Sequence, residues 1–228
     1  KGERLEELLP VIEQSGVNYT EEAGAVTVLG LSKHSKDAAE GVNAIVGLAE
    51  SLSLIQPHPA LLFIADAVGE DATGAALFGE IKDEPSGALS FNIATLFIDE
   101  ERSEIGIDIR IPVLADKDAL VERLTEVVAS YQLQYEEFDY LAPLYVPLDS
   151  PLVSTLMKVY QEETGDQTPA MSSGGATFAR TMENCVAYGA LFPGAEQTEH
   201  QANERAKLED LYRALEIYAE TIRRLATT

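Results

Sequence analysis

Two apolar segments joined by a charged turn constrain the fold of this chain more than any other feature of its sequence. Ala88–Asp99 and Glu104–Val113 alternate apolar and polar residues, and the sequence DEERS, Asp99–Ser103, connects them. Alternation with a period of two is typical of β-strands, and a short polar turn between two such segments predicts an antiparallel hairpin. The rest of the fold has to cover the apolar face of this hairpin.

The second expected strand carries an acid and a base on one face. Asp108 and Arg110 point the same way because side chains along a strand repeat every two residues. The opposite face carries Ile107, Ile109 and Ile111. Two interpretations stay open: an exposed acid–base pair on a solvated sheet face, or a site where the planar guanidinium of Arg110 binds a carboxylate.

Segments with helical periodicity flank the hairpin on both sides. We expect six helices, over Lys1–Ser15, Asp37–Leu52, Gln56–Gly79, Asp116–Tyr131, Pro151–Glu163 and Glu204–Ala226, the second of them with Asp37 as its N-cap. Two further strands are expected, over Ala25–Leu29 and Gln132–Asp139. This layout predicts an α+β fold with one antiparallel sheet and helices on one of its faces. Pro143, Pro147 and Pro151 indicate a boundary between a first domain, 1–146, and a smaller second domain, 147–228.

Composition argues against several classes of partner. The formal net charge of −23 disfavours nucleic acid and anionic membranes, since both would repel the protein surface. No run of about 18 apolar residues and no basic-then-apolar leader occurs, which argues against a membrane span and a signal peptide. Cys185 is the one cysteine, so no internal disulfide can form and a reducing, cytoplasmic compartment is expected.

His34 and His200 are the candidate chemical groups outside the hairpin. His34 lies in a turn after the strand Ala25–Leu29, and His200 lies near the end of the polar stretch Ser172–Glu204, just before the last helix. A neutral imidazole can bind a metal, and an imidazole N–H can donate a hydrogen bond or a proton to a substrate. The alternative for each is a solvated loop histidine.

Three motifs together resemble one enzyme superfamily. GLSKHSKDAAEGVNA, Gly30–Ala44, resembles the lid-domain signature of the zinc aminopeptidase, carboxypeptidase and aminoacylase superfamily, although Lys33 and Ala38 stand where that signature usually has Ala and Pro. GIDIRIP, Gly106–Pro112, resembles the lid strand that carries the substrate arginine. SSGGATFARTMENCVAYGALFPGAEQTEHQANE, Ser172–Glu204, resembles the C-terminal end of the catalytic domain in the dipeptidase V branch.

This resemblance implies a role for each candidate residue. It makes His200 a ligand of one of two zinc ions, with manganese or cobalt as substitutes, and His34 the lid group that polarises the scissile carbonyl and stabilises the oxyanion. Arg110 would hold the C-terminal carboxylate of a dipeptide, with Asn92 as a further substrate contact from the neighbouring strand. The loop whose backbone lies along the substrate would comprise Ser173, Gly174, Gly175 and Ala176.

The protein implied by the resemblance is a zinc-dependent dipeptidase that hydrolyses the amide bond of dipeptides with a metal-activated water. In that family the other metal ligands lie N-terminal to the lid, and no H-x-D motif occurs in this chain. Glu162 and Glu163 are interpreted as solvated charges at a helix end. We therefore expect 1–146 to be the lid domain and 147–228 an incomplete α/β catalytic segment. The N-terminal catalytic half would be absent, and the chain alone would be inactive.

The last helix and Arg110 each carry one more expectation. The apolar stripe of Glu204–Ala226 would normally pack on the absent half, so we expect it to be exposed here and to promote self-association. The alternative to an enzyme is a non-enzymatic α+β module that binds a small anionic ligand or a partner chain through Arg110. The enzyme, unlike the module, needs His34 and His200 to face one cleft.

Overall fold

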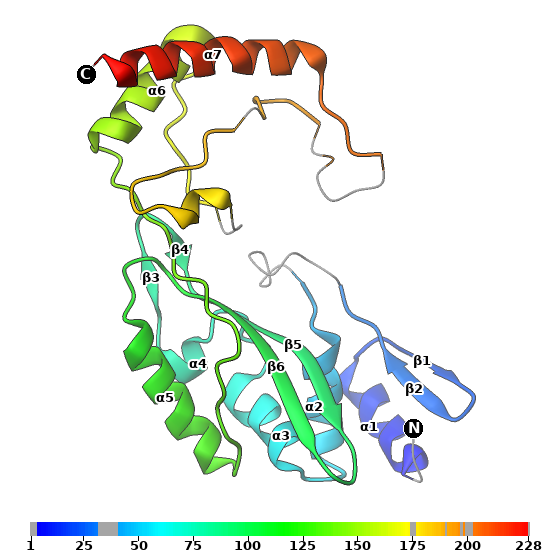
Figure 1. Ribbon diagram of the computed structural model, residues 1–228. Coiled ribbons are helices and arrows are strands. Elements are labelled where there is room, and N and C mark those ends of the chain that lie inside the picture. Colours follow the sequence, from blue (N-terminus) through cyan, green and yellow to red (C-terminus); the bar gives the residue numbers. More distant parts are fainter. Residues whose placement is uncertain are drawn as a thin grey trace. The chain divides into compact units, whose positions relative to one another are not determined.

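The structure, a computed structural model, describes residues 4–31, 41–173, 177–189, 191–196, 198 and 203–227. The chain divides into two compact units, Lys1–Leu141 and Ala142–Thr228, each of which is described by itself below (Figure 1). Helices and small antiparallel sheets together make the fold α+β, as the sequence predicts. The prediction of one sheet is wrong, because the described strands form three separate two-stranded sheets. Within the described residues, no helix combines the length and the apolar composition that crossing a bilayer requires.

The described residues of the first unit form three antiparallel strand pairs and several helices. In chain order its elements are α1 (Leu5–Ser15), β1 (Tyr19–Glu22), β2 (Ala25–Val28), α2 (Ala44–Ser53), α3 (Pro59–Leu62), the π-helix η2 (Phe63–Val68), α4 (Ala75–Phe78), β3 (Lys82–Asp83), β4 (Gly87–Ala88), β5 (Ser90–Ile98), β6 (Ser103–Arg110) and α5 (Lys117–Ser130). The pairs are β1–β2, β3–β4 and β5–β6. The longest of them, β5–β6, is the hairpin that the sequence predicts, and it is confirmed.

The core of this unit lies against the apolar face of β5–β6. Phe91 and Ile93 of β5 are buried there together with residues of α2, α3, η2 and α5. A register shift between Ile93 and Thr95 changes which side chains of β5 face the core, so Leu96 packs on the same cluster as Phe91. Opposite the shift stands Gly106, where a Cβ would lie only 2.3 Å from Thr95 Oγ1.

The second unit is a pair of helices with a small core. It contains α6 (Pro151–Thr164), the 3₁₀-helix η3 (Phe178–Thr181) and α7 (Leu208–Ala226). Ser150 caps α6 by accepting a hydrogen bond from Val153 N at 3.2 Å, and Gly165 ends the helix in the left-handed region, with φ of 74°. The buried cluster between α6 and α7 consists of Val159, Phe192, Ala214 and Ile217.

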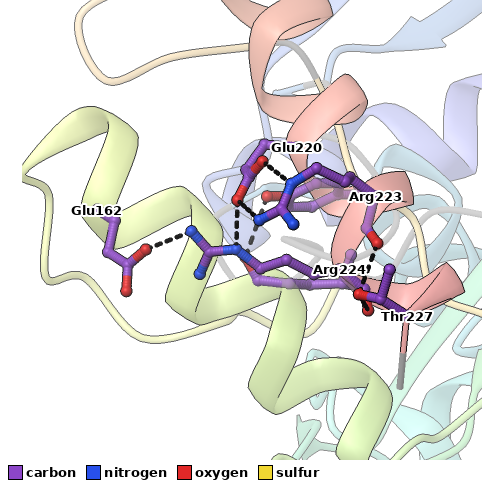
Figure 2. A network of polar contacts seen from close by, with 7 residues as sticks. Glu162, Glu220, Arg223, Arg224 and Thr227 are labelled. Atoms are coloured by element: carbon purple, nitrogen blue, oxygen red, sulfur yellow. Dashed lines mark hydrogen bonds and ion pairs between the residues drawn. The ribbon is translucent and has the colours of Figure 1, made fainter.

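An ion-pair network joins the end of α7 to α6 within the second unit (Figure 2). Arg224 contacts Glu162 of α6 at 2.5 Å and Glu220 of its own helix at 2.6 Å, and Arg223 contacts Glu220 at 2.7 Å. Hydrogen bonds from Arg223 and Arg224 lower the pKa of the Glu220 carboxyl from 4.5 to about 2. The interpretation of Glu162 as a helix-surface charge is therefore confirmed, although this charge is paired.

The structure corrects three sequence-based expectations. The helix expected from Asp37, which lies outside the described residues, begins at Ala44 after an N-cap at Asn43. Gln56–Gly79 is not one helix: α3 continues directly into the π-helix η2, and Gly69 and Gly74, which adopt positive φ values, separate η2 from α4. Gln132–Asp139 is not a strand. Its Leu133 and Tyr135 pack against the core, which preserves the alternation of burial, but no ladder to another strand forms among the described residues.

Candidate functional site

Five of the eight residues predicted for the site lie outside the described part of the chain: His34, Gly174, Gly175, Ala176 and His200. Arg110 and Asn92 lie in the first unit, on the β5–β6 hairpin. Ser173 lies in the second unit, exposed and outside regular secondary structure, between α6 and η3. The geometry that follows is therefore that of the first unit.

Arg110 and Asp108 lie side by side on the polar face of β5–β6, opposite the face that covers the core. Arg110 Nη2 donates a hydrogen bond to Asp108 Oδ2 at 3.0 Å, as their spacing along the strand predicts. Asn92 stands directly across the ladder from Asp108, and Ser90 stands across from Arg110. The Arg110 side chain is 42% exposed. An ion pair this exposed adds little to the stability of the fold. The same exposure leaves the guanidinium accessible to a ligand.

Asn43 connects this polar face to the start of α2. Its Nδ2 donates to Asn92 Oδ1 at 3.0 Å and to the Ile93 carbonyl at 2.8 Å. Its Oδ1 accepts from the backbone N–H groups of Ile45 at 2.9 Å and Val46 at 3.4 Å, which caps the helix. Sequence reasoning did not single out Asn43, although an Asn immediately before a helical stripe is a recognisable N-cap signal.

Both ends of the segment that contains His34 are held beside Asn43. Leu31 and Val42 form an isolated antiparallel bridge, with Leu31 N to Val42 O at 3.0 Å and Val42 N to Leu31 O at 3.1 Å. Gly30 permits this approach, because a Cβ there would lie 2.3 Å from Val42 O and 3.1 Å from Ala44 N. The described residues thus fix where this segment starts and ends, next to the polar face of the hairpin.

A second set of hydrogen bonds fixes the segment that follows β6, just after Arg110, to the β3–β4 hairpin. Asp83 Oδ2 accepts from Leu114 N at 2.9 Å, and Ser86 Oγ accepts from Val113 N at 2.9 Å. Partial burial would raise the pKa of the Asp83 carboxyl, but the hydrogen bonds from Leu114 and Ser86 outweigh it and the pKa is lowered. The carboxylate therefore stays charged at neutral pH and ties the end of β6 to the β3–β4 turn.

The described residues do not by themselves form a metal site. Nowhere in the described ranges do three His, Cys, Asp or Glu side chains converge in a way that could hold a metal ion. A catalytic zinc needs about three protein ligands. Glu162, interpreted from the sequence as a solvated helix charge, forms an ion pair with Arg224.

The comparisons with known proteins agree on one family. The sequence profile of peptidase family M20/M25/M40 matches residues 11–224. "Putative dipeptidase YtjP" of Bacillus subtilis is 34% identical over 228 residues, covering 97% of this chain and 49% of the relative. "Putative dipeptidase SH1171" of Staphylococcus haemolyticus and "Putative dipeptidase MW1694" of Staphylococcus aureus are 27% and 29% identical over 202 residues, covering 86% of this chain and 43% of each relative.

The family match includes both units of the chain. It starts in α1 and ends in α7, and it contains Asn43, Asn92 and Arg110. The chain spans about half the length of the curated relatives it matches. With a profile that matches nearly its whole length, this chain belongs to peptidase family M20/M25/M40.

Proposed function

We propose that this chain supplies the lid domain, residues 1–146, and the C-terminal catalytic segment, residues 147–228, of a cytoplasmic zinc-dependent dipeptidase. Family membership and relatives named as dipeptidases support the reaction class. The observation that carries the proposal is the arrangement around Asn43. The hydrogen bond from Asn43 to Asn92 holds the start of α2 against the polar face of β5–β6, which also carries the exposed Arg110. The Leu31–Val42 bridge, where the segment containing His34 starts and ends, lies next to Asn43 in the chain.

Arg110 is proposed to bind the C-terminal carboxylate of the dipeptide. A guanidinium presents its N–H groups in one plane, which matches the two oxygens of a carboxylate. Asn92 lies on the same face, and because its Oδ1 accepts from Asn43, a contact with substrate would come from its amide nitrogen. The net charge of −23 favours the ammonium end of a dipeptide electrostatically.

His34 is proposed to act on the scissile carbonyl, and the backbone of Ser173, Gly174, Gly175 and Ala176 to lie along the substrate. An imidazole N–H aimed at the developing oxyanion stabilises the transition state more than the ground state, and removing such a donor typically costs about 100-fold or more in rate. The hydrogen-bonded base of the His34 segment supports this role, since a donor must be held in place to contribute.

Metal binding is assigned only in part to this chain. Members of the family are generally metal-dependent. His200 is proposed as one ligand in a two-zinc site, with manganese or cobalt as substitutes. The described residues do not fit a complete site, so the other ligands would come from the half that the relatives carry in addition. The chain alone is therefore proposed to be inactive.

The first test is an activity assay of the purified chain with zinc or manganese on simple dipeptides. We expect no turnover, because a metal held by one histidine cannot activate water in a defined geometry. Robust turnover would show that the chain holds a complete site and would refute its proposed inactivity.

The second test measures binding to Arg110 without requiring catalysis. Titration of the chain with a dipeptide, followed by NMR, should shift the signals of Arg110 and Asn92. We expect Arg110→Lys to weaken binding, because a single ammonium cannot bind bidentately, and Arg110→Ala to abolish it. Arg102→Ala is the matched control: Arg102 is an exposed arginine on the same hairpin that lies over the Phe97 ring. An equal loss in this control would contradict the assignment.

The second candidate function is a non-enzymatic module that binds a small anion or a partner chain through Arg110. The exposed Arg110–Asp108 pair on the polar face of the hairpin favours it. A dipeptide and acetate distinguish the two functions. Equal binding of both ligands supports the module, whereas selective binding of the dipeptide, lost when its carboxylate is amidated, supports the dipeptidase.

A further inference from the structure

A carboxylate lies directly beside the arginine that is proposed to bind the substrate carboxylate. Asp108 Oδ2 accepts a hydrogen bond from Arg110 Nη2 at 3.0 Å, and the two side chains are 36% and 42% exposed. An ion pair this exposed contributes little to the stability of the fold. The acid also offsets the positive charge that attracts a carboxylate ligand, so its main effect falls on the ligand rather than on the fold.

The register of β5–β6 places this acid within the proposed site. Asn92 stands opposite Asp108 in the ladder, and Ser90 stands opposite Arg110. Residues directly opposite each other in an antiparallel ladder have Cα atoms about 5 Å apart. A ligand that contacts both Arg110 and Asn92 therefore also lies against Asp108.

Glu104 is the other acid on the polar face of this hairpin, whose two strands the structure describes completely. It lies four residues before Asp108, which corresponds to about 13 Å along a strand. Its own partner is Arg102, at 3.8 Å. Exposed charges interact over about 8 Å at physiological ionic strength. Glu104 therefore shares the face with Asp108 but is too far from Arg110 to act on a ligand bound there.

The covalent structure of a dipeptide determines which of its groups Asp108 would meet. Two carboxylates that share one guanidinium lie about 5 Å apart, since each accepts a hydrogen bond of about 2.8 Å from it. The side chain of the C-terminal residue branches from the carbon atom next to the bound carboxylate, so a charge at its end lies within about 8 Å of Asp108. The side chain of the N-terminal residue starts beyond the peptide bond and is farther away.

We propose that Asp108 is a specificity-determining residue that favours dipeptides with a basic C-terminal residue over those with an acidic one. Arg110 binds the backbone carboxylate. Asp108 attracts an ammonium or guanidinium group on the adjoining side chain and repels a carboxylate at the same position. This inference rests on the proposed dipeptidase function, from which it takes the position of the substrate carboxylate.

The expected selectivity is modest, because the pair is exposed to solvent. One unit charge about 6 Å from another, in surroundings rich in water, changes a dissociation constant by about 3-fold. Attraction of a lysine side chain and repulsion of a glutamate side chain add, so Gly-Lys should bind about 10-fold more tightly than Gly-Glu, with Gly-Gln between them. The net charge of −23 acts in the same direction, so the control has to change the net charge equally.

NMR titration of the 228-residue chain with these three dipeptides measures the selectivity. Asp108→Asn keeps an oxygen that can accept from Arg110 but removes the charge, and should bring Gly-Lys and Gly-Glu to within about 3-fold of each other. Glu104→Gln is the matched control: it removes one negative charge from the same face and should keep the wild-type ratio. A purely structural role of Asp108 would weaken all three dipeptides equally and leave the ratio unchanged.

A second neutral variant and a salt series guard against misfolding of the first variant. Asp108→Ser also removes the charge, and circular dichroism shows whether each variant is folded. Raising the salt concentration from about 0.05 M to about 0.5 M shortens the screening length, so the wild-type ratio should fall toward that of the neutral variants, and theirs should change less. A wild-type ratio no more sensitive to salt than that of the neutral variants would contradict the role of Asp108.

The possible outcomes separate this inference from the function on which it rests. Binding of Gly-Lys that survives Arg110→Ala, or amidation of the dipeptide carboxylate, contradicts the assignment of Arg110 and with it the proposed function. Binding that is lost in both tests, with a ratio that Asp108→Asn leaves unchanged or that Glu104→Gln lowers as much, overturns the role of Asp108 alone. No detectable binding of any dipeptide contradicts both proposals.

Discussion

At the scale of single residues, Asn43 has the most far-reaching contacts in the candidate site. One amide satisfies two backbone N–H groups at the start of α2 and reaches across to the Ile93 carbonyl and Asn92 on β5. A carboxylate could serve the first role but not the second, because it has no hydrogen to donate. The residue therefore fixes the helix that follows the His34 segment to the strand that carries Asn92.

Replacing Asn43 separates these two roles. Asn43→Ala removes both, and we expect the free energy of unfolding to fall by about 2 kcal/mol, roughly 1 for the cap and 1 for the bonds to β5. Asn43→Asp keeps the cap acceptor and should lose about half as much. Urea unfolding followed by circular dichroism measures both. Equal losses in the two variants would mean that the cap contributes nothing.

At the scale of elements, the β1–β2 hairpin turns through a residue that is poorly suited to its position. Ala23 and Gly24 lie between the strands with φ of 49° and 69°, so both are in the left-handed region. Glycine adopts this region readily, whereas a residue with a Cβ does so at a cost of about 1 kcal/mol. The hairpin forms despite this cost because its register is set by four residue pairs.

Ala23→Gly should relieve the strain in this turn. We expect a gain of up to about 1 kcal/mol in the stability of the first unit, partly offset by the greater freedom of glycine in the unfolded chain. The reciprocal change, Gly24→Ala, has room for its Cβ but keeps a positive φ, and should be destabilising. Thermal unfolding of both variants checks the prediction, and an Ala23→Gly variant that melts earlier than the wild type would contradict it.

The ion-pair network at the end of α7 predicts a dependence on pH. The folded-state pKa of Glu220 is lowered from 4.5 to about 2 by its hydrogen bonds to Arg223 and Arg224. Its contribution to stability is therefore complete above about pH 4.5 and is lost as the pH falls toward about 2. Hydrogen exchange in the second unit, measured across this range, should show α7 opening more readily at the acidic end.

The Glu220→Gln variant tests whether Glu220 causes the loss of α7 stability at acidic pH. The amide cannot ionise, so the variant should be less stable at neutral pH and should lose the part of the pH dependence that Glu220 contributes. Glu163→Gln, an adjacent change on α6, serves as the control and should keep the wild-type profile. If both variants behave like the wild type, the network does not stabilise α7.

At the scale of the whole molecule, the chain has two cores of unequal size. The first unit buries a cluster that includes Phe63, Ile64, Phe91 and Leu124, contributed by helices and by the hairpin. The cluster of the second unit consists of Val159, Phe192, Ala214 and Ile217. Burial of apolar area is the main source of folding free energy, so the second unit should be the less stable one.

Unfolding should therefore proceed in two transitions. With increasing urea, hydrogen exchange should reveal opening of Ala142–Thr228 before Lys1–Leu141. A polypeptide of residues 1–141 alone should reproduce the higher transition. A single transition shared by both units would contradict the prediction.

Local patterns determined most of the elements, because the signals for them lie within a few residues. The alternation of Ala88–Asp99 and Glu104–Val113 predicts β5–β6, and the helices expected to begin at Asp116 and Pro151 begin there or at the next residue in the structure. The same reasoning places Asp108 and Arg110 on one face, which their hydrogen bond confirms. It also predicts the apolar stripe of α7 and its exposure, which the structure shows.

Only the tertiary structure decided how distant residues meet. Asn43 and Asn92 are 49 positions apart, and nothing local to either one indicates their hydrogen bond. Gln132–Asp139 alternates like a strand, but a strand forms only where a partner offers backbone groups. Likewise, the periodicity of α7 defines two apolar faces, and it is the surface of α6 that determines which of them is covered.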